Sequence, residues 1–438
     1  MNAKTLYSLI AAALVALVAA WWINSAQKPV SESAEQNKAL LPGFREQVND
    51  VNAITFTGAD NKVLATLKRG SAGWTVVEKS GYPVDVTRLR EFLLKLSDAT
   101  VLEQKTSNPK NYSGLGVNDV TDKDASGVLV TLDGLKQPVK LIVGNYNGAG
   151  GGGTFVRREG DAQSLLVKGN LTVEKAVANW EKKDIADVAA TRVKQAVLTN
   201  SEGKVLKVYK DQPGDANFKV ADVPKGREVS SDFVANALGS TLSGLRADDA
   251  FPARDMPPGD KVYKANYLTF DGVAIDMAAW VKDGKDYAQF TASLDNAAAT
   301  ANIDADQAKA KADYAVAMQG AAGKAAETKA DDGAGKKSAA ATDPVAKTAA
   351  EPIAPLAVSD PAKDQAERLK VLNDEIAALN KTFAGWTFAL PSFKFTNIDK
   401  SMDDMLKPLE QKKPEAKDAT KPVSGKPAAK PATPATKP

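Results

Sequence analysis

The chain has 438 residues, with 57 lysine and arginine residues against 54 aspartate and glutamate residues, and it contains neither cysteine nor histidine. These two absences exclude Ser-His-Asp and Cys-His relays, tetrahedral Cys/His zinc sites, iron–sulfur clusters and a disulfide framework. At roughly 150 residues per domain, the length allows two or three globular units. No catalytic, cofactor-binding or metal-binding motif stands out, so the sequence predicts a non-catalytic protein.

The N-terminal segment has the composition of a membrane anchor. Residues 6–23 carry no charge, and a helix of that length would extend about 27 Å, close to the thickness of a bilayer's hydrocarbon core. Lys4 precedes the segment and favours a cytoplasmic N-terminus. We therefore predict a single span over residues 1–26 of an inner membrane, with the bulk of the chain in the periplasm or outside. The residues assigned to the anchor are Leu6, Ile10, Leu14, Leu17, Trp21, Trp22 and Ile23.

A cleaved signal peptide is the alternative for this segment. Its apolar stretch should span about 7–15 residues and should end in a small-x-small site. Cleavage after residues 18–20 would leave two tryptophans at the new N-terminus, and residues 24–26 place an asparagine at the outer small position. The uncleaved anchor is therefore the interpretation that we adopt.

After a polar stalk over residues 27–44, two stretches of the chain repeat each other. Short β-rich runs at 51–56, 62–67 and 74–77 have counterparts at 193–198, 204–209 and 218–220, each separated by Gly, Asp or Asn turns. An amphipathic helix follows each set, first over 86–96 behind Asp85 or Thr87, then over 233–242 behind Ser230 or Ser231. The pattern predicts an α+β fold with two copies of a β-meander-plus-helix unit, over residues 45–185 and 186–296.

The composition changes abruptly after the second unit. Alanine supplies 22 of the 54 residues from 297 to 350, and large apolar residues almost disappear. Such a segment buries little apolar surface, so we expect a flexible linker or insertion over 297–362, with transient helix favoured by alanine. Residues 363–410 then predict a helix, which could also form a coiled coil, followed by a strand pair over 386–395 and a short helix, together completing the second unit. The Lys/Pro/Ala-rich tail over 411–438 is typical of a disordered extension.

Three motifs have functional and structural interpretations. The run Gly148 to Gly153 lacks the Gly-Lys-Ser/Thr and the helix of a phosphate loop, so it predicts a hairpin tip. Residues 122–133 imitate a calcium-binding loop, but no helix flanks them. The pairs Asp248-Asp249 and Asp403-Asp404 could supply carboxylate catalysis, although a solvated surface pair or a helix start explains them more simply. The tryptophans fall in strand or helix patterns and predict core packing.

The ordered set of motifs resembles the "domain of unknown function 4340" family. The likeness runs from the Trp74 strand through Tyr82-Pro83 and its helix, Tyr112-Ser-Gly-Leu115, Leu141-Ile-Val-Gly144 and the strand at Thr154, and covers most of residues 45–295. The second unit lacks the Tyr-Pro and Gly-Leu motifs. The resemblance implies a membrane-anchored protein associated with ABC transporters of the gliding-motility type, and it supplies no catalytic residues.

These observations favour an accessory subunit that acts by protein–protein interaction. The expected partners are an ABC permease or an auxiliary extracytoplasmic subunit, together with the membrane through the N-terminal helix. Nucleic acid is not expected. A cell-envelope or glycan-binding module, with weak contact between the lysine tail and anionic polymers, is the alternative, and a carboxylate-based hydrolase is a third hypothesis.

Overall fold

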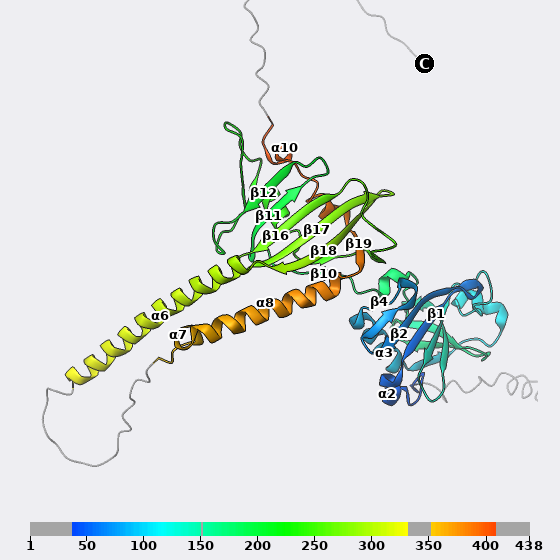
Figure 1. Cartoon of the computed structure of the whole chain (residues 1–438). Helices are drawn as coiled ribbons and strands as arrows, with labels where there is room; N and C mark the ends of the chain where they lie inside the picture. Colours follow the sequence, from blue (N-terminus) through cyan, green and yellow to red (C-terminus); the bar gives the residue numbers. More distant parts are fainter. Residues whose placement is uncertain (1–36, 150–151, 332–351, 409–438) are drawn as a thin grey trace, which may run out of the picture.

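The computed structural model describes residues 37–149, 152–331 and 352–408. The anchor predicted over residues 1–26 and the tail over 411–438 lie outside these ranges. Within them, no helix combines the length and the apolar character needed to cross a membrane. The described part is a mixed fold built on two large antiparallel sheets and several helices (Figure 1).

The first sheet has nine strands in the order β4-β3-β2-β1-β6-β7-β8-β9-β5, and its neighbouring strands pair antiparallel. Helix α3 (Val86–Ser97) buries one apolar face against this sheet, and the side chain of Asp85 caps it by accepting a hydrogen bond from the backbone N–H of Arg88. The strands are β1 (Ala53–Thr57), β2 (Val63–Gly70), β3 (Gly73–Val76), β4 (Tyr82–Pro83), β5 (Val101–Gln104), β6 (Val128–Asp133), β7 (Val139–Asn147), β8 (Gly153–Arg158) and β9 (Ser164–Lys168).

The second sheet has eight strands in the order β13-β12-β11-β16-β17-β18-β19-β15. Taken from β3 to β5, the strands of the first sheet follow one another in the same order as these eight, and helix α5 (Asp232–Gly239) occupies the place of α3 in the chain. The strands are β11 (Val193–Thr199), β12 (Val205–Tyr209), β13 (Lys219–Val220), β15 (Asp249–Pro252), β16 (Tyr263–Thr269), β17 (Val273–Lys282), β18 (Lys285–Leu294) and β19 (Trp386–Leu390). A small ribbon of β10 (Asp184–Ala186) and β14 (Leu245–Arg246) lies apart from both sheets.

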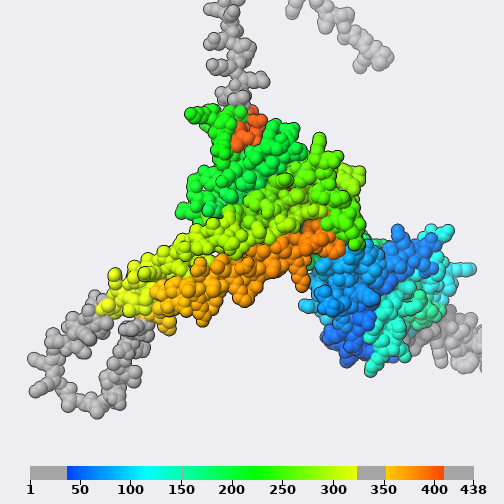
Figure 2. Space-filling model, in the orientation of Figure 1, coloured from blue at the N-terminus to red at the C-terminus, as the bar shows by residue number. Residues whose placement is uncertain are grey.

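The largest difference between the two sheets is an inserted helical segment, which we call the arm. Strands β8 and β9 are joined by residues 159–163, whereas the corresponding strands β18 and β19 are separated by α6 (Asn296–Asp331), α7 (Leu356–Ser359) and α8 (Pro361–Phe383). Figures 1 and 2 show α6 and α8 side by side, in yellow and orange, projecting away from the second sheet.

The expectation of a flexible linker is therefore wrong for the residues that form α6. Alanine is the strongest helix former, so the segment needs only one narrow apolar stripe to be held as a helix. Ala299 and Ile303 supply that stripe at the start of α6 and are buried. The amide of Gln307 also donates hydrogen bonds to Asp364 Oδ2 (2.9 Å) and to the carbonyl of Pro361 (2.8 Å) on α8.

The last elements return to the second sheet. Strand β19 pairs with β18 and β15. Beyond the stretch where β18 pairs with β19, the Asn380 side chain of α8 exchanges two hydrogen bonds with the backbone of Ala292, at 2.7 and 2.8 Å. The strand pair expected over 386–395 is half wrong, because Pro391 ends the strand and starts the short helix α9 (Ser392–Phe395).

Candidate functional site

Residue Tyr82 of the first unit is buried in the core of the second. Its ring packs edge-on against Trp386, with centroids 4.8 Å apart, and also meets Phe388. Its hydroxyl donates a hydrogen bond to the carbonyl of Lys182 at 3.0 Å, and burial raises its pKa. Only 1% of Tyr82 is exposed, so the Tyr82-Pro83 motif joins the two units.

A charged cluster lies beside this joint. Lys79, from the 3-10 helix η3 (Val77–Lys79), places Nζ 3.1 Å from Oε1 of Glu181 and also binds the carboxylate of Asp249 on β15. The lysine lies over the ring of Phe251, 4.9 Å from its centroid. Oε1 of Glu181 accepts no hydrogen bond from the described residues, so Lys79 interacts with it through charge. We call Lys79, Glu181 and Asp249 the joint cluster.

The joint cluster holds two carboxylates around one ammonium group. Only 1% of the Glu181 side chain is exposed, and its Oε2 accepts a hydrogen bond from the backbone N–H of Ala250 at 3.1 Å. Burial, reinforced by the nearby charge of Asp249, raises the pKa of Glu181 to about 7. Loss of water and a like charge both disfavour the ionised form, and they outweigh the attraction of Lys79 here.

A perturbed carboxyl group can mark a catalytic acid or base, but access decides between catalysis and structure. Neither Glu181 nor Asp249 lines any of the five cavities described in the chain. The interpretation of Asp248-Asp249 as a solvated pair is wrong for Asp249, which is only 28% exposed and paired with Lys79. The joint cluster links the two units, because Lys79 lies in the first unit and Asp249 in the second.

Two of the motifs that carry the family resemblance meet inside the first unit. A Cβ atom added to Gly144 would lie 2.4 Å from the carbonyl oxygen of Leu115, so only glycine fits there. Tyr112, from the same turn as Leu115, stacks under the guanidinium of Arg157 at 4.7 Å. Arg157 also donates to the carbonyl of Val117 at 2.9 Å. The segment around Tyr112 thus covers the outer face of the first sheet.

The base of the arm is fixed by a network of charges. Arg192, in the connection between β10 and β11, donates two hydrogen bonds to Glu375 of α8, at 2.6 and 2.7 Å, and a third to Asp271 at 2.7 Å. Hydrogen bonding to Glu375 raises the pKa of Arg192. Further out, Arg368 of α8 pairs with Asp306 of α6 at 2.8 Å. Paired guanidinium and carboxylate groups with this geometry hold a fixed orientation.

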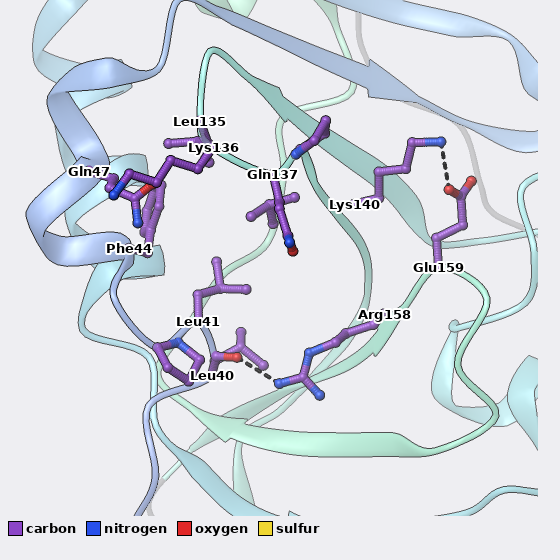
Figure 3. Close-up of a pocket in the computed structure, with 13 residues that line it drawn as sticks. Leu40, Leu41, Phe44, Gln47, Leu135, Lys136, Gln137, Lys140, Arg158 and Glu159 are labelled. Carbon is purple, nitrogen blue, oxygen red and sulfur yellow. Dashed lines mark hydrogen bonds and ion pairs between the residues drawn. The ribbon is translucent and has the colours of Figure 1, made fainter.

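A cavity of about 620 Å³ opens in the first unit beside the point where the described chain begins (Figure 3). Backbone hydrogen bonds tie residues 37–40 to the edge strand β5, and the chain then continues into the short helix α2 (Phe44–Gln47), which forms one wall. The opposite wall is the β6–β7 hairpin. Arg158 at the end of β8 donates to the carbonyl of Leu40 at 2.8 Å. We call this cavity the entry pocket.

The remaining sequence motifs have structural roles or lie outside the described residues. The anchor residues Leu6, Ile10, Leu14, Leu17, Trp21, Trp22 and Ile23 belong to the undescribed N-terminus. Asp404 accepts hydrogen bonds from the backbone and hydroxyl of Ser401, which confirms a helix start there. The calcium-like loop does not close, because Asp133 ends the extended strand β6, far from Asp122. Within the described ranges, no three acidic side chains converge as a metal site would require.

Two of the three charged residues of the joint were not singled out from the sequence, whereas Asp249 was considered only as part of an acidic pair. Lys79 and Glu181 each occur in short polar stretches that resemble surface turns, and 101 residues lie between them in the sequence. The strand pattern around Tyr82 predicts core packing, which its burial confirms, but it does not indicate that the core is that of the second unit. Its proline neighbour and the short β4 strand were the available signals, since a rigid, extended Tyr-Pro step can present a ring to another surface.

Comparison with known proteins gives one match. No curated protein and no solved structure matches the chain. A family model matches residues 74–266, which run from β3 in the first sheet to β16 in the second and so include the joint cluster but not the arm. The match supports the assignment of this segment to the family described as Domain of unknown function (DUF4340).

Proposed function

We propose that this protein is a membrane-anchored accessory subunit, facing the periplasm, that binds other subunits of an ABC-type transport system of the gliding-motility type. It acts by protein–protein interaction and carries no catalytic site. The observation that supports this proposal best is the arm, a long projection inserted into one of two sheets with the same strand order. An insertion of this kind adds surface without contributing strands to the sheet.

The arm is suited to reach a partner. At about 1.5 Å per residue, the 36 residues of α6 extend about 54 Å. The ion pairs of Arg192 and Arg368 and the hydrogen bonds of Gln307 lie at the base of the arm. The outer part of the arm therefore presents most of its surface to solvent. Val316, on the outer part of α6, is 69% exposed. A long projection whose outer part is mostly exposed offers a surface that a partner can contact.

The test is crosslinking of the full chain in its native membrane, followed by purification and mass spectrometry. A shortened arm, with a Gly/Ser loop in place of residues 310–359, keeps the Gln307–Asp364 and Asp306–Arg368 contacts and the Asp360 cap of α8. We expect the native chain to capture an ABC permease or its extracytoplasmic auxiliary subunit. The shortened arm should lose that capture.

A matched control is Phe233→Ala on α5, which removes an exposed ring from the same unit without touching the arm. This variant should capture the same partners as the native chain. Equal capture by the native chain and by the shortened arm would contradict a role for the arm. Recovery of cell-wall fragments instead of transporter subunits would contradict the proposal as a whole.

A glycan-binding role is the second candidate, and one observation favours it. In the first sheet, the outer-face row Leu129, Ile142, Arg157 lies under the Tyr112 segment. In the second sheet, the row Lys264, Ala278, Gln289 has the same pairing and borders a cavity of about 640 Å³. Amide, hydroxyl and charged side chains there, including Asn266 and Asp276, are typical of sugar recognition.

The glycan role is tested by binding to purified cell-wall sacculi at moderate salt. The half-buried floor of the cavity allows the double variant Asn266→Ala with Gln289→Ala, whose side chains donate hydrogen bonds to Asp276 and Thr387. Salt-resistant binding that this variant abolishes would favour the glycan role. Binding that disappears at modest salt reflects charge alone and would count against it.

A further inference from the structure

We infer that the entry pocket is a binding site for an amphiphile whose head is an oxyanion, a phosphate or a carboxylate, and whose body is apolar. The inference rests on the arrangement of charge and apolar surface in the pocket. It goes beyond the accessory role proposed above, since a binding protein needs no such site.

Arg158 supplies the first part of the argument. One of its terminal N–H groups is held by the carbonyl of Leu40, and no carboxylate among the described residues lies within ion-pair distance of it. The remaining N–H groups of the guanidinium are therefore available to a ligand. A planar guanidinium fixed at one end presents a fork that matches two oxygens of a phosphate or a carboxylate.

The balance of charge in the pocket points the same way. Lys136, Lys140 and Arg158 line it against the single carboxylate of Glu159. Glu159 pairs with Lys140 at 2.8 Å, which leaves Lys136 and Arg158 without a counter-ion among the described residues. An excess of cationic side chains in a concave site raises the local concentration of anions.

The walls supply the apolar part. Leu40, Leu41 and Phe44 form one side, and Leu135, Pro138 and Val139 form the other. Figure 3 shows the Gln137 side chain between the two walls, with Arg158 at the rim near Leu40. Apolar walls with a few polar groups that fix orientation are the usual composition of a site for a small ligand.

The position of the pocket makes a membrane lipid the first candidate ligand to test. Its wall follows directly on residues 37–40, and ten residues separate the anchor predicted over 1–26 from the first described residue. If that anchor is present, the pocket lies within about 40 Å of the membrane surface, because an extended chain covers at most ~3.6 Å per residue. An anionic lipid headgroup and a soluble anionic amphiphile offer the same chemistry and are distinguished by the test.

The probe is hexyl phosphate, titrated by calorimetry into the full chain in a neutral detergent. A titration with inorganic phosphate measures the affinity for the head group without the apolar body. We expect saturable binding of hexyl phosphate at least about tenfold tighter than that of phosphate, since each buried methylene contributes about fourfold. Arg158→Gln should weaken binding by about 10-fold to 100-fold, because it removes charge-assisted hydrogen bonds.

Two further variants separate binding from folding. Gln137→Trp replaces an exposed side chain, fills the cavity and leaves Arg158 and its bond to Leu40 in place, so it should abolish binding without lowering the melting temperature. Arg90→Gln makes the same change of net charge on the exposed face of α3 and should bind like the native chain. Partition of the probe into detergent is common to all four proteins and cancels in the comparison.

Equal heats from all four proteins, or no binding at millimolar probe, would overturn the inference. The source is then assigned in nanodiscs. Weaker binding of hexyl phosphate in phosphatidylglycerol discs than in phosphatidylcholine discs shows that a lipid headgroup occupies the pocket. Equal binding in both shows that the ligand is a soluble amphiphile.

Discussion

The stability of the joint between the two units should depend on pH through Glu181. The unfolded chain releases the proton of this carboxyl group near its ordinary pKa of 4.5, whereas the folded chain holds it until about pH 7. Between these values the folded state binds more protons than the unfolded state, so the free energy of unfolding falls as pH rises. The difference of 2.5 pKa units corresponds to a total fall of about 3 kcal/mol, complete a little above pH 7.

The variant Glu181→Gln isolates this effect. A glutamine can still accept the hydrogen bond from Ala250, and its amide can donate to Asp249, while Lys79 keeps its pairing with Asp249. We expect urea unfolding between pH 5 and pH 8.5 to show a fall of about 2.5 kcal/mol in the native chain, because the first part of the total fall occurs below pH 5, and a much smaller fall in the variant. At pH 8.5 the variant should be the more stable of the two.

The control is Glu91→Gln on α3, an exposed carboxyl group with no partner in the described residues. Its pH profile should superimpose on that of the native chain. If Glu181→Gln keeps the native slope, or if the native chain gains stability as pH rises through 7, the assignment of a buried, proton-holding carboxyl group is wrong.

Three further predictions follow from packing and geometry. Tyr82→Ala should lower the free energy of unfolding by about 3–5 kcal/mol in urea titrations, since it empties a buried site, whereas Tyr82→Phe should cost about 1 kcal/mol. Gly144→Ala should lower the melting temperature by several degrees because its Cβ would meet the Leu115 carbonyl, whereas Gly214→Ala, in open space, should not. Arg192→Met should speed amide hydrogen exchange in α8 but not in α3, with a loss of about 1–2 kcal/mol because the pairs with Glu375 and Asp271 are partly exposed.

Local patterns in the sequence were enough to predict several of the helices and strands. The spacing of Val86, Leu89, Phe92, Leu93 and Leu96 predicted one apolar face of a helix. The last four are buried against the first sheet, whereas Val86 in the first turn is exposed. Runs in which apolar and polar residues alternate predicted the strands β1, β2, β11 and β12. Alternate side chains of a strand point to opposite faces of the sheet, so burial of one face gives the sequence a period of two residues. These matching runs predicted two copies of one unit, and the two sheets share their strand order from β3 to β5.

Long-range relations were harder to predict. The alanine-rich segment lacks large apolar residues, and its composition does not show that two buried residues, Ala299 and Ile303, can position the start of a long helix. The joint cluster depends on three residues from separate polar stretches, each of which is ordinary by itself. Pairing across such distances is decided by tertiary packing, which a single sequence does not encode in any local period.

The insertion of the arm also affects the order in which the second sheet can form. Strand β19 must pair with β18 across residues 295–385, whereas β9 reaches β8 across residues 159–163. By loop-closure entropy alone, the longer separation costs about 2–3 kcal/mol more. Contacts between α6 and α8 hold the two strand ends near each other. Because they shorten the effective loop between β18 and β19, we expect the arm to form before the sheet closes. The arm would then act as a kinetic guide for the C-terminal strand, and shortening it to its base should change the refolding rate more than the final stability.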